Sequence, residues 1–324
     1  MRFSYRDRTG RVDRVLLKHE LRSRLPHELS RRPRTRLWEL TAPRPDVDRI
    51  EYQFELIHRD GSSEYATDPQ NPLRASGPWG DKSVLELPGY EPPEWLGSEQ
   101  TGDVQNLELP SRLLHTSLPA VLWAHPDADE GSPLLVAHDG PEYAEHSSLV
   151  TLLGRLPPLR AALIAPVNRN EMYSASARYA RALVEEILPA LPAAPVRVGL
   201  GASLGALALL HAHRRHPNSF DGLFLQSGSF FRRRDLYERW FPRFPRISRF
   251  VGSVLGGGTP RPIPLTISCG NVEENLASNR VVAEALREQG HDVDFREFRD
   301  GHNWVAWRDD LHPRLSELIH RASE

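Results

Sequence analysis

The stretch that decides the fold is VRVGLGASLGALALLHAHRR, residues 196–215. Its first five residues have the apolar composition of a buried strand, and the residues from 204 onward have that of a helix. Between them lies Gly201-Ala202-Ser203-Leu204-Gly205, whose two glycines allow the backbone to turn sharply. A serine in such a strand–turn–helix unit projects its hydroxyl above the sheet. The flanking strand and helix make this common five-residue pattern specific, and they predict Ser203 as a nucleophile.

The same alternation of strands and helices continues on both sides of this turn. Helical periodicity covers residues 177–191 and 279–290. Further buried strands are predicted from the apolar runs that begin at Pro133, Ala161, Gly222 and Pro264, and from the run that begins at Asp292. This alternation predicts an α/β domain with a mostly parallel central sheet and helices on both faces, over residues 107–324.

The first hundred residues have a different pattern. They lack long helical periodicity and contain short strand-like runs at residues 15–17, 37–40 and 50–57. The last of these, IEYQFELI, alternates apolar and polar side chains as a half-buried strand does. Residues 88–106 are rich in proline, glycine and glutamate and have the composition of a linker. Residues 1–106 are therefore expected to form a small β-sandwich followed by a linker.

Composition excludes several classes of function. The 324 residues leave room for about two domains. With 41 basic and 43 acidic side chains, the net charge of -2 predicts no binding to nucleic acid or to a membrane surface. Cys269 is the single cysteine, so no intramolecular disulfide can form, and neither a metal nor a cofactor is expected. The three histidines of the helix after the turn, at positions 211, 213 and 216, are expected at its surface.

The N-terminal residues lack the apolar run of a signal peptide, and no stretch approaches the roughly 20 apolar residues of a membrane span. We therefore expect a cytoplasmic protein. The sequence does not indicate an oligomeric state.

A serine nucleophile needs a base and an acid, and both have candidates at strand ends. His302 follows the last predicted strand, where the base lies in a sheet of this type, since the chain order is serine, acid, histidine. The loop after the strand that begins at Pro264 contains Glu273 and Glu274. Either carboxylate could orient the imidazole and stabilise its charged form. We prefer Glu273.

Six segments resemble the enterochelin esterases and the wider esterase D group, which includes mycolyltransferases and feruloyl esterases. They are LLVAHDG (134–140), NRNEMY (168–173), GASLGA (201–206), LQSGSFF (225–231), GNVEENLASNR (270–280) and GHNWVAWRDDL (301–311). Residues 68–72, DPQNP, also resemble the N-terminal immunoglobulin-like domain of the enterochelin esterases. The resemblance implies an α/β-hydrolase fold and a serine carboxylic ester hydrolase with a Ser203, Glu273, His302 triad.

One position departs from the pattern of these families. In the relatives, the residue after the Asp-Gly of the first segment supplies an amide to the oxyanion hole, but here it is Pro141, which has no N–H. We expect Leu204 to supply one donor. The second must come from Gly140, from Glu142 or from a side chain, and we take Gly140. Because losing one donor costs about a hundredfold or more in rate, the hole is expected to be shifted or the enzyme slow.

The substrate is expected at the carboxyl ends of the strands. Phe230 and Phe231 end one strand and are predicted to contact an aromatic ring such as a catechol. Arg232 opens a run of three arginines that is predicted to lie near the pocket mouth and bind the substrate, although such a run is more often a solvated loop. Arg169 matches an arginine that the relatives carry beside an anionic siderophore. The resemblance thus implies a siderophore-type ester, a ferric siderophore included, and we expect the N-terminal domain to cap the pocket.

Two alternatives stay open. The protein could act as an esterase or acyltransferase on another carboxylic ester, such as an acylated sugar or a hydroxycinnamate. It could also be a binding module that kept the fold and lost activity. Pro141 favours the second alternative, whereas the intact pair of Ser203 and His302 argues against it.

Overall fold

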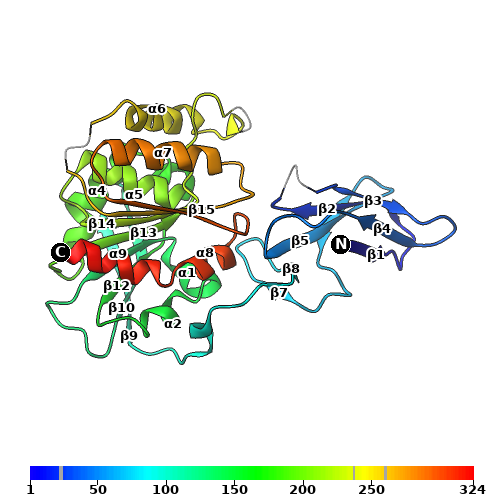
Figure 1. Ribbon diagram of the computed structural model, residues 1–324, viewed down its shortest axis with the longest axis horizontal. Coiled ribbons are helices and arrows are strands. Elements are labelled where there is room, and N and C mark those ends of the chain that lie inside the picture. The colour runs from blue at the N-terminus through cyan, green and yellow to red at the C-terminus, as the bar shows by residue number, and fades with distance from the viewer. Residues whose placement is uncertain (22–24, 236–237, 259–260) are drawn as a thin grey trace. The chain divides into compact units, whose positions relative to one another are not determined.

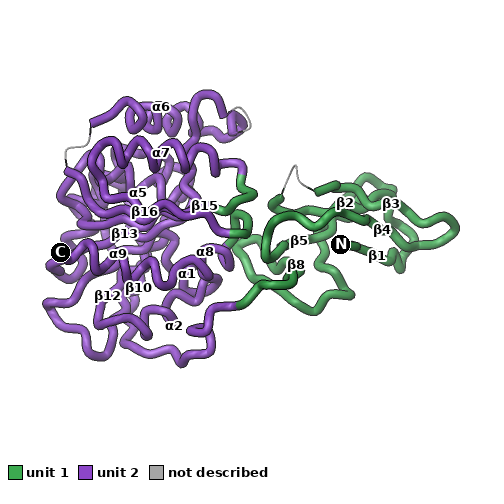
Figure 2. Tube along the Cα trace, in the orientation of Figure 1, with its two compact units in different colours: residues 1–91, 270–273, 299–303 green, residues 92–269, 274–298, 304–324 purple. Residues whose placement is uncertain are grey.

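The chain divides into two compact units in the computed structural model, which describes residues 1–21, 25–235, 238–258 and 261–324 (Figure 1). Unit 1 contains residues 1–91 together with two short loops, 270–273 and 299–303 (Figure 2). Unit 2 contains residues 92–269, 274–298 and 304–324. The predicted linker is shorter than expected, because the first strand of unit 2 already begins at Asp103 and Trp95 is buried in the core of that unit.

Unit 1 consists of short strands that pair antiparallel. They are β1 (Arg2–Arg6), β2 (Val12–His19), β3 (Glu28–Arg31), β4 (Leu37–Thr41), β5 (Arg49–His58), β6 (Ser63–Ala66), β7 (Arg74–Ala75) and β8 (Lys82–Glu86). The strands pair in one continuous path, β1-β4-β3-β2-β5-β8-β7, and β6 adds to β5.

This path folds back on itself. Strands β1 and β5 are separated by three others in the path. Nevertheless, the ring of Phe3 on β1 lies 5.0 Å from that of Tyr52 on β5, and Tyr5 lies 5.6 Å from Phe54. Strands β1 and β5 therefore face each other across a small apolar core, as strands in the two layers of a sandwich do.

Unit 2 is built on an eight-stranded sheet with the order β16-β15-β14-β13-β11-β12-β10-β9. The strands from β11 to β15 pair in parallel, and β9 and β10 are antiparallel to their neighbours. Their bounds are β9 (Asp103–Ser111), β10 (Thr116–Ala124), β11 (Leu134–His138), β12 (Arg160–Ile164), β13 (Arg197–Ala202), β14 (Gly222–Gln226), β15 (Leu265–Gly270) and β16 (Val293–Phe298).

Helices cover both faces of this sheet (Figure 1). Their bounds are α1 (Gly140–His146), α2 (Leu149–Leu153), α3 (Arg169–Tyr173), α4 (Ala177–Ala182), α5 (Leu204–Arg215), α6 (Phe244–Leu255), α7 (Leu276–Glu288), α8 (Trp304–Asp310) and α9 (Arg314–Ser323). One core cluster joins the sheet to α4, α5, α6 and α7, and a second joins it to α1, α2, α8 and α9. Successive residues of β11 enter opposite clusters, because a strand points its side chains alternately to the two faces.

Two details differ from the sequence predictions. The helix predicted over residues 177–191 ends as α4 at Ala182 and continues as a π-helical turn and a 3-10 turn up to Ala190. The expectation that His211 and His213 lie at the surface is wrong, since their exposures are 6% and 0%. Helix α5 is covered by its neighbours, and the His211 ring packs edge-on against Phe250 of α6. Among the described residues, no helix is both long and apolar enough to cross a bilayer.

Candidate active site

Ser203 sits in a strained turn between β13 and α5. Its φ is 57° and its ψ is -119°, a conformation that a non-glycine residue adopts only when its surroundings enforce it. A Cβ added at Gly201 would lie 2.7 Å from the carbonyl carbon of Gly205, and one at Gly205 would lie 3.3 Å from Cβ of His138. Close approach of the backbone therefore excludes a side chain at Gly201, and at Gly205 a side chain would be crowded by His138.

Neighbouring groups hold this turn. The Ser203 amide donates a hydrogen bond of 2.8 Å to the carbonyl of Gln226 at the end of β14. The Ser229 amide in turn donates to the Ser203 carbonyl at 3.1 Å, and the two hydroxyl oxygens are also 3.1 Å apart. Sequence reasoning missed Ser229, although it lies inside the LQSGSFF segment. Its position makes it the hydroxyl that directs the Ser203 side chain.

The segment between β11 and α1 lies against the first turn of α5. The His138 imidazole Nδ1 is 3.2 Å from the Gly205 carbonyl oxygen. Asp139 has a left-handed φ of 52°. A Cβ at Gly140 would overlap the backbone of Leu163, so only glycine fits there. Pro141 occupies the first turn of α1, where a missing N–H leaves no helical bond unmade.

The oxyanion donors expected from the sequence are available. Among the described residues, neither the Leu204 amide nor the Gly140 amide has a hydrogen-bond acceptor. Both follow a residue with positive φ, and both open a helix, α5 and α1 respectively. Amides at helix N-termini favour negative charge, so each can receive a developing oxyanion.

Arg169, which the sequence placed beside the substrate, has a protein partner. Its Nε lies 2.9 Å from Oδ1 of Asp139, and its Nη2 lies 2.8 Å from Oδ2. The Asp139 side chain is only 2% exposed, whereas that of Arg169 is 37% exposed. The guanidinium also stands 5.8 Å from the centre of the Tyr173 ring. Arg169 therefore holds the residue that precedes Gly140 and fixes the loop that presents that amide.

The two remaining catalytic candidates meet within unit 1. The Nδ1 of His302 is 2.7 Å from Oε2 of Glu273. The Glu273 side chain is 1% exposed, and its Oε1 accepts a hydrogen bond of 2.8 Å from the Gly270 amide, so the carboxylate is held at both oxygens. Glu274 is exposed. Of the two candidate acids, the structure brings Glu273 to His302.

The structure corrects the role expected for the aromatic pair after β14. Phe230 is fully buried and Phe231 is 7% exposed, and the Phe231 ring stacks on Phe244 of α6. Neither ring is therefore open to a substrate. The position of these residues after a strand did not reveal their burial, because the helix that covers Phe231 is formed by residues further along the chain.

Arg232 also has a structural role. Its side chain is 11% exposed and forms an ion pair of 3.0 Å with Asp235. Asp235 in turn accepts a hydrogen bond of 2.7 Å from the Ser278 hydroxyl of α7. The exposed members of the arginine run are Arg233 and Arg234.

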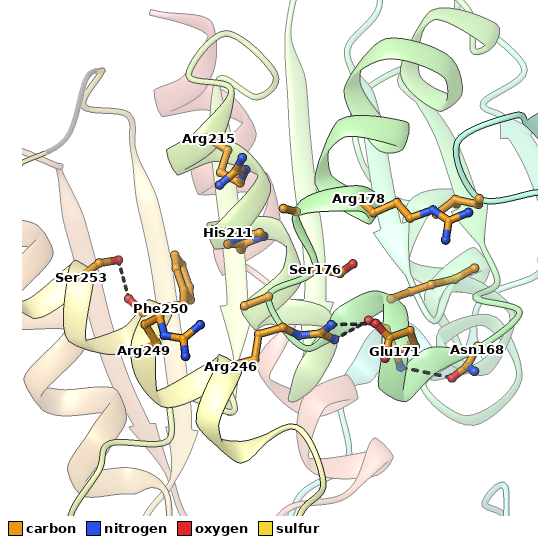
Figure 3. A pocket seen from close by; sticks show the side chains of 14 residues that line it. Asn168, Glu171, Ser176, Arg178, His211, Arg215, Arg246, Arg249, Phe250 and Ser253 are labelled. Carbon is orange, nitrogen blue, oxygen red and sulfur yellow. Dashed lines mark hydrogen bonds and ion pairs between the residues drawn. The ribbon is translucent and has the colours of Figure 1, made fainter.

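Arginine-rich hollows lie on both sides of α6. One, of about 790 Å³, is lined by residues of α3 to α6 and includes Arg178, Arg215, Arg246 and Arg249. Figure 3 shows Arg246 directed at Glu171, and the two lie 2.7 Å apart. The other hollow, of about 650 Å³, is lined by all three arginines of residues 232–234 and again by Arg249. Unit 2 therefore presents positive charge on both sides of this helix.

The sheet order and the serine turn are those of the α/β-hydrolase fold. No protein-family model matches the chain. The iron(III) enterobactin esterase of Dickeya dadantii (strain 3937) is 30% identical over 208 residues, which are 55% of this chain and 46% of that protein. The match thus spans about half the length of this curated relative.

Solved structures extend the comparison to the whole chain. The enterobactin esterase of Shigella flexneri, crystallised in the presence of enterobactin, has a TM-score of 0.79 at 22% identity, covering 98% of this chain and 92% of that one. The ferric enterobactin esterase of Salmonella typhimurium has a TM-score of 0.78 at 20% identity, covering 98% and 93%. The resemblance of this chain to the enterochelin (enterobactin) esterases is therefore confirmed.

The structural role of Arg169 is testable. Arg169→Gln removes the partner of the buried Asp139 carboxylate, so we expect a loss of about 1 to 2 kcal/mol in the free energy of unfolding, reduced from the cost of a fully buried pair because Arg169 is partly exposed. Urea denaturation measures it. Arg181→Gln is the matched control, since the Arg181–Glu185 pair is 59% and 46% exposed. Equal stability of the two variants would contradict the role assigned to Arg169.

Proposed function

We propose that the protein is a serine ester hydrolase in which Ser203 is the nucleophile, His302 the general base and Glu273 the acid. The observation that carries the proposal is the strained turn at Ser203, a conformation that costs stability and that an ordinary loop does not need. The 2.7 Å contact between His302 and Glu273 supports it, because a base needs an orienting carboxylate. The order of serine, acid and histidine along the chain also fits.

The reaction follows from these roles. His302 takes the proton of the Ser203 hydroxyl as the oxygen attacks the ester carbonyl, and Glu273 stabilises the resulting imidazolium. The oxyanion of the tetrahedral intermediate accepts hydrogen bonds from the amides of Leu204 and Gly140. His302 then gives its proton to the departing alcohol. Water, activated by the same imidazole, hydrolyses the acyl-enzyme. In this scheme the Gly140 amide replaces the donor that Pro141 cannot supply.

For the substrate, we propose an anionic siderophore-type ester, ferric siderophores included. The relatives support this choice, since those described above are named as enterobactin esterases. The charge of unit 2 supports it independently: Arg233, Arg234 and Arg249 are exposed and line one hollow. A ferric tris-catecholate is strongly anionic, so a cluster of guanidinium groups would speed its capture.

Removing the nucleophile tests the reaction class. Ser203→Ala should abolish both hydrolysis of an aryl ester and labelling by a fluorophosphonate, because only an activated serine forms the covalent adduct. Mass spectrometry of the labelled protein identifies the modified residue. Ser229→Ala, which removes the adjacent hydroxyl, should still be labelled. A labelled Ser203→Ala variant would refute the assignment.

The choice of acid is tested by a pair of neighbouring substitutions. Glu273→Gln should lower kcat by about a hundredfold or more, since the neutral amide cannot stabilise the imidazolium. Glu274→Gln changes the exposed next position and should stay within about twofold of the parent, as most surface substitutions do. Steady-state kinetics on one aryl ester gives both values. A larger loss of kcat in Glu274→Gln than in Glu273→Gln would show that Glu274 is the acid.

Salt dependence separates an anionic substrate from a neutral one. The kcat/KM for a ferric tris-catecholate ester should fall as ionic strength rises, because charges are screened over about 8 Å at physiological salt, whereas a neutral aryl ester should change little. A variant with Arg233→Gln and Arg234→Gln should lose most of the salt effect. Equal salt dependence for the two esters would favour a plainer substrate, such as a hydroxycinnamate.

A further inference from the structure

Buried charges lie on the strands of unit 1. Arg49 and Glu51 on β5 have side chains that are 4% and 5% exposed, and they approach each other to 3.5 Å. Lys82 on β8 lies 3.4 Å from the other oxygen of Glu51 and pairs with Glu20 as well. Burying charges in so small a domain is costly and does little for its stability. Such a network therefore points to a need for fixed geometry.

A further member of this network comes from the loop that carries His302. Oδ2 of Asp300 lies 3.5 Å from Nη1 of Arg49, across 251 positions of the chain. The other oxygen of Asp300 accepts hydrogen bonds from the Gly301 amide at 2.6 Å and from the Asn303 side chain at 3.0 Å. These two donors flank His302 in sequence. Asp300 thus shapes the turn around His302, and Arg49 holds Asp300.

The ionisation of Asp300 depends on the charge of its partner Arg49. Burial raises the pKa of Asp300 to about 7, while the Arg49 guanidinium acts in the opposite direction. Without the guanidinium, the buried carboxyl would favour its neutral form, which accepts hydrogen bonds less strongly. The geometry around His302 therefore depends on the charge of Arg49.

The loop that carries Glu273 is held by the same domain. Val272 packs in an apolar cluster whose other members come from residues 21–87, and the Asn271 side chain donates a hydrogen bond of 2.8 Å to the Asp46 carbonyl. Nearby, the Asp48 amide donates to the Arg299 carbonyl at 2.7 Å. Residues 42–51 thus contact both the loop that carries Glu273 and the loop that carries His302.

We propose that the N-terminal domain is a scaffold for the catalytic base and acid, and that Arg49 is the positioning residue that fixes the His302 loop through Asp300. This inference rests on the proposed function and goes beyond the capping role expected from the sequence. The domain acts on the rate of the chemical step, because a misplaced base slows proton transfer even when substrate still binds.

The kinetic test uses the full chain and an aryl ester. Arg49→Met should lower kcat roughly tenfold or more and leave KM within about threefold, since misplacing a catalytic group by 1 Å can cost about a hundredfold. Arg49→Lys should recover part of kcat. Arg14→Met is the control, because Arg14 pairs with Glu28 at an exposed site of the same domain. A kcat for Arg49→Met within about twofold of the parent would overturn the proposal.

Loss of stability must be separated from loss of position. Tyr52 lies on the same strand as Arg49. Tyr52→Phe removes its 2.8 Å hydrogen bond to the buried Asp68. It should lower the melting temperature with kcat unchanged. A double-mutant cycle of Arg49→Met with Asp300→Asn should be non-additive in kcat, because both act through one contact. Additive losses, or an equal loss of kcat in Tyr52→Phe, would show a merely structural role.

NMR tests the position of His302 independently of activity. The downfield proton NMR signal of His302 Nδ1–H, bonded to Glu273, should shift or broaden in Asp300→Asn and in Arg49→Lys, and should persist in Arg14→Met. These milder substitutions serve if Arg49→Met does not fold. A signal unchanged in both would overturn the inference. A parent protein without hydrolysis or serine labelling would refute the proposed function alone, and the NMR result would still decide the positioning role.

Discussion

The strained backbone at Ser203 is the constraint on which the hydrolase unit depends. Ser203 has a positive φ, and the chain packs closely around it: a Cβ at Gly201 would lie 2.7 Å from the backbone of Gly205, and one at Gly205 would lie 3.3 Å from Cβ of His138. The same close approach brings the segment of His138 against the start of α5. The turn at Ser203, the N-terminus of α5 and the segment of Asp139 and Gly140 are therefore packed together, and the Arg169–Asp139 ion pair fixes that segment further.

Local sequence patterns predicted most of this architecture, because strand alternation, helical periodicity and glycine turns depend on neighbouring residues. The parallel sheet followed from apolar runs of strand length alternating with helical periodicity, and the turn at Ser203 followed from glycine spacing. Preference for Glu273 over its neighbour rested on family likeness. In the structure, the choice is made by the Gly270 amide, which holds one carboxylate oxygen and turns the other towards His302.

The sequence failed where the answer depends on what covers a segment. Phe230 follows a strand, and His213 lies on a helix. Either position is compatible with exposure, yet both residues are fully buried because other elements lie over them. Arg232 likewise forms an ion pair with Asp235. The separation of three residues does not reveal that this pair is buried. Whether another element covers a loop or the outer face of a helix depends on long-range packing, which the local pattern does not determine.

The contacts between Arg49, Asp300 and the loop of His302 show why a charged network suits this place. An apolar contact is non-directional and tolerates sliding of a loop by a fraction of a side chain. A guanidinium facing a carboxylate, whose second oxygen binds groups on both sides of His302, tolerates far less. Val272 beside Glu273 uses the apolar kind of contact, and there the Gly270 amide supplies the missing direction. The candidate acid Glu273 thus has one apolar contact beside it and one directional hydrogen bond, whereas the loop of the candidate base His302 is held by directional contacts through Asp300, and directional contacts of this kind are what a preorganised pair requires.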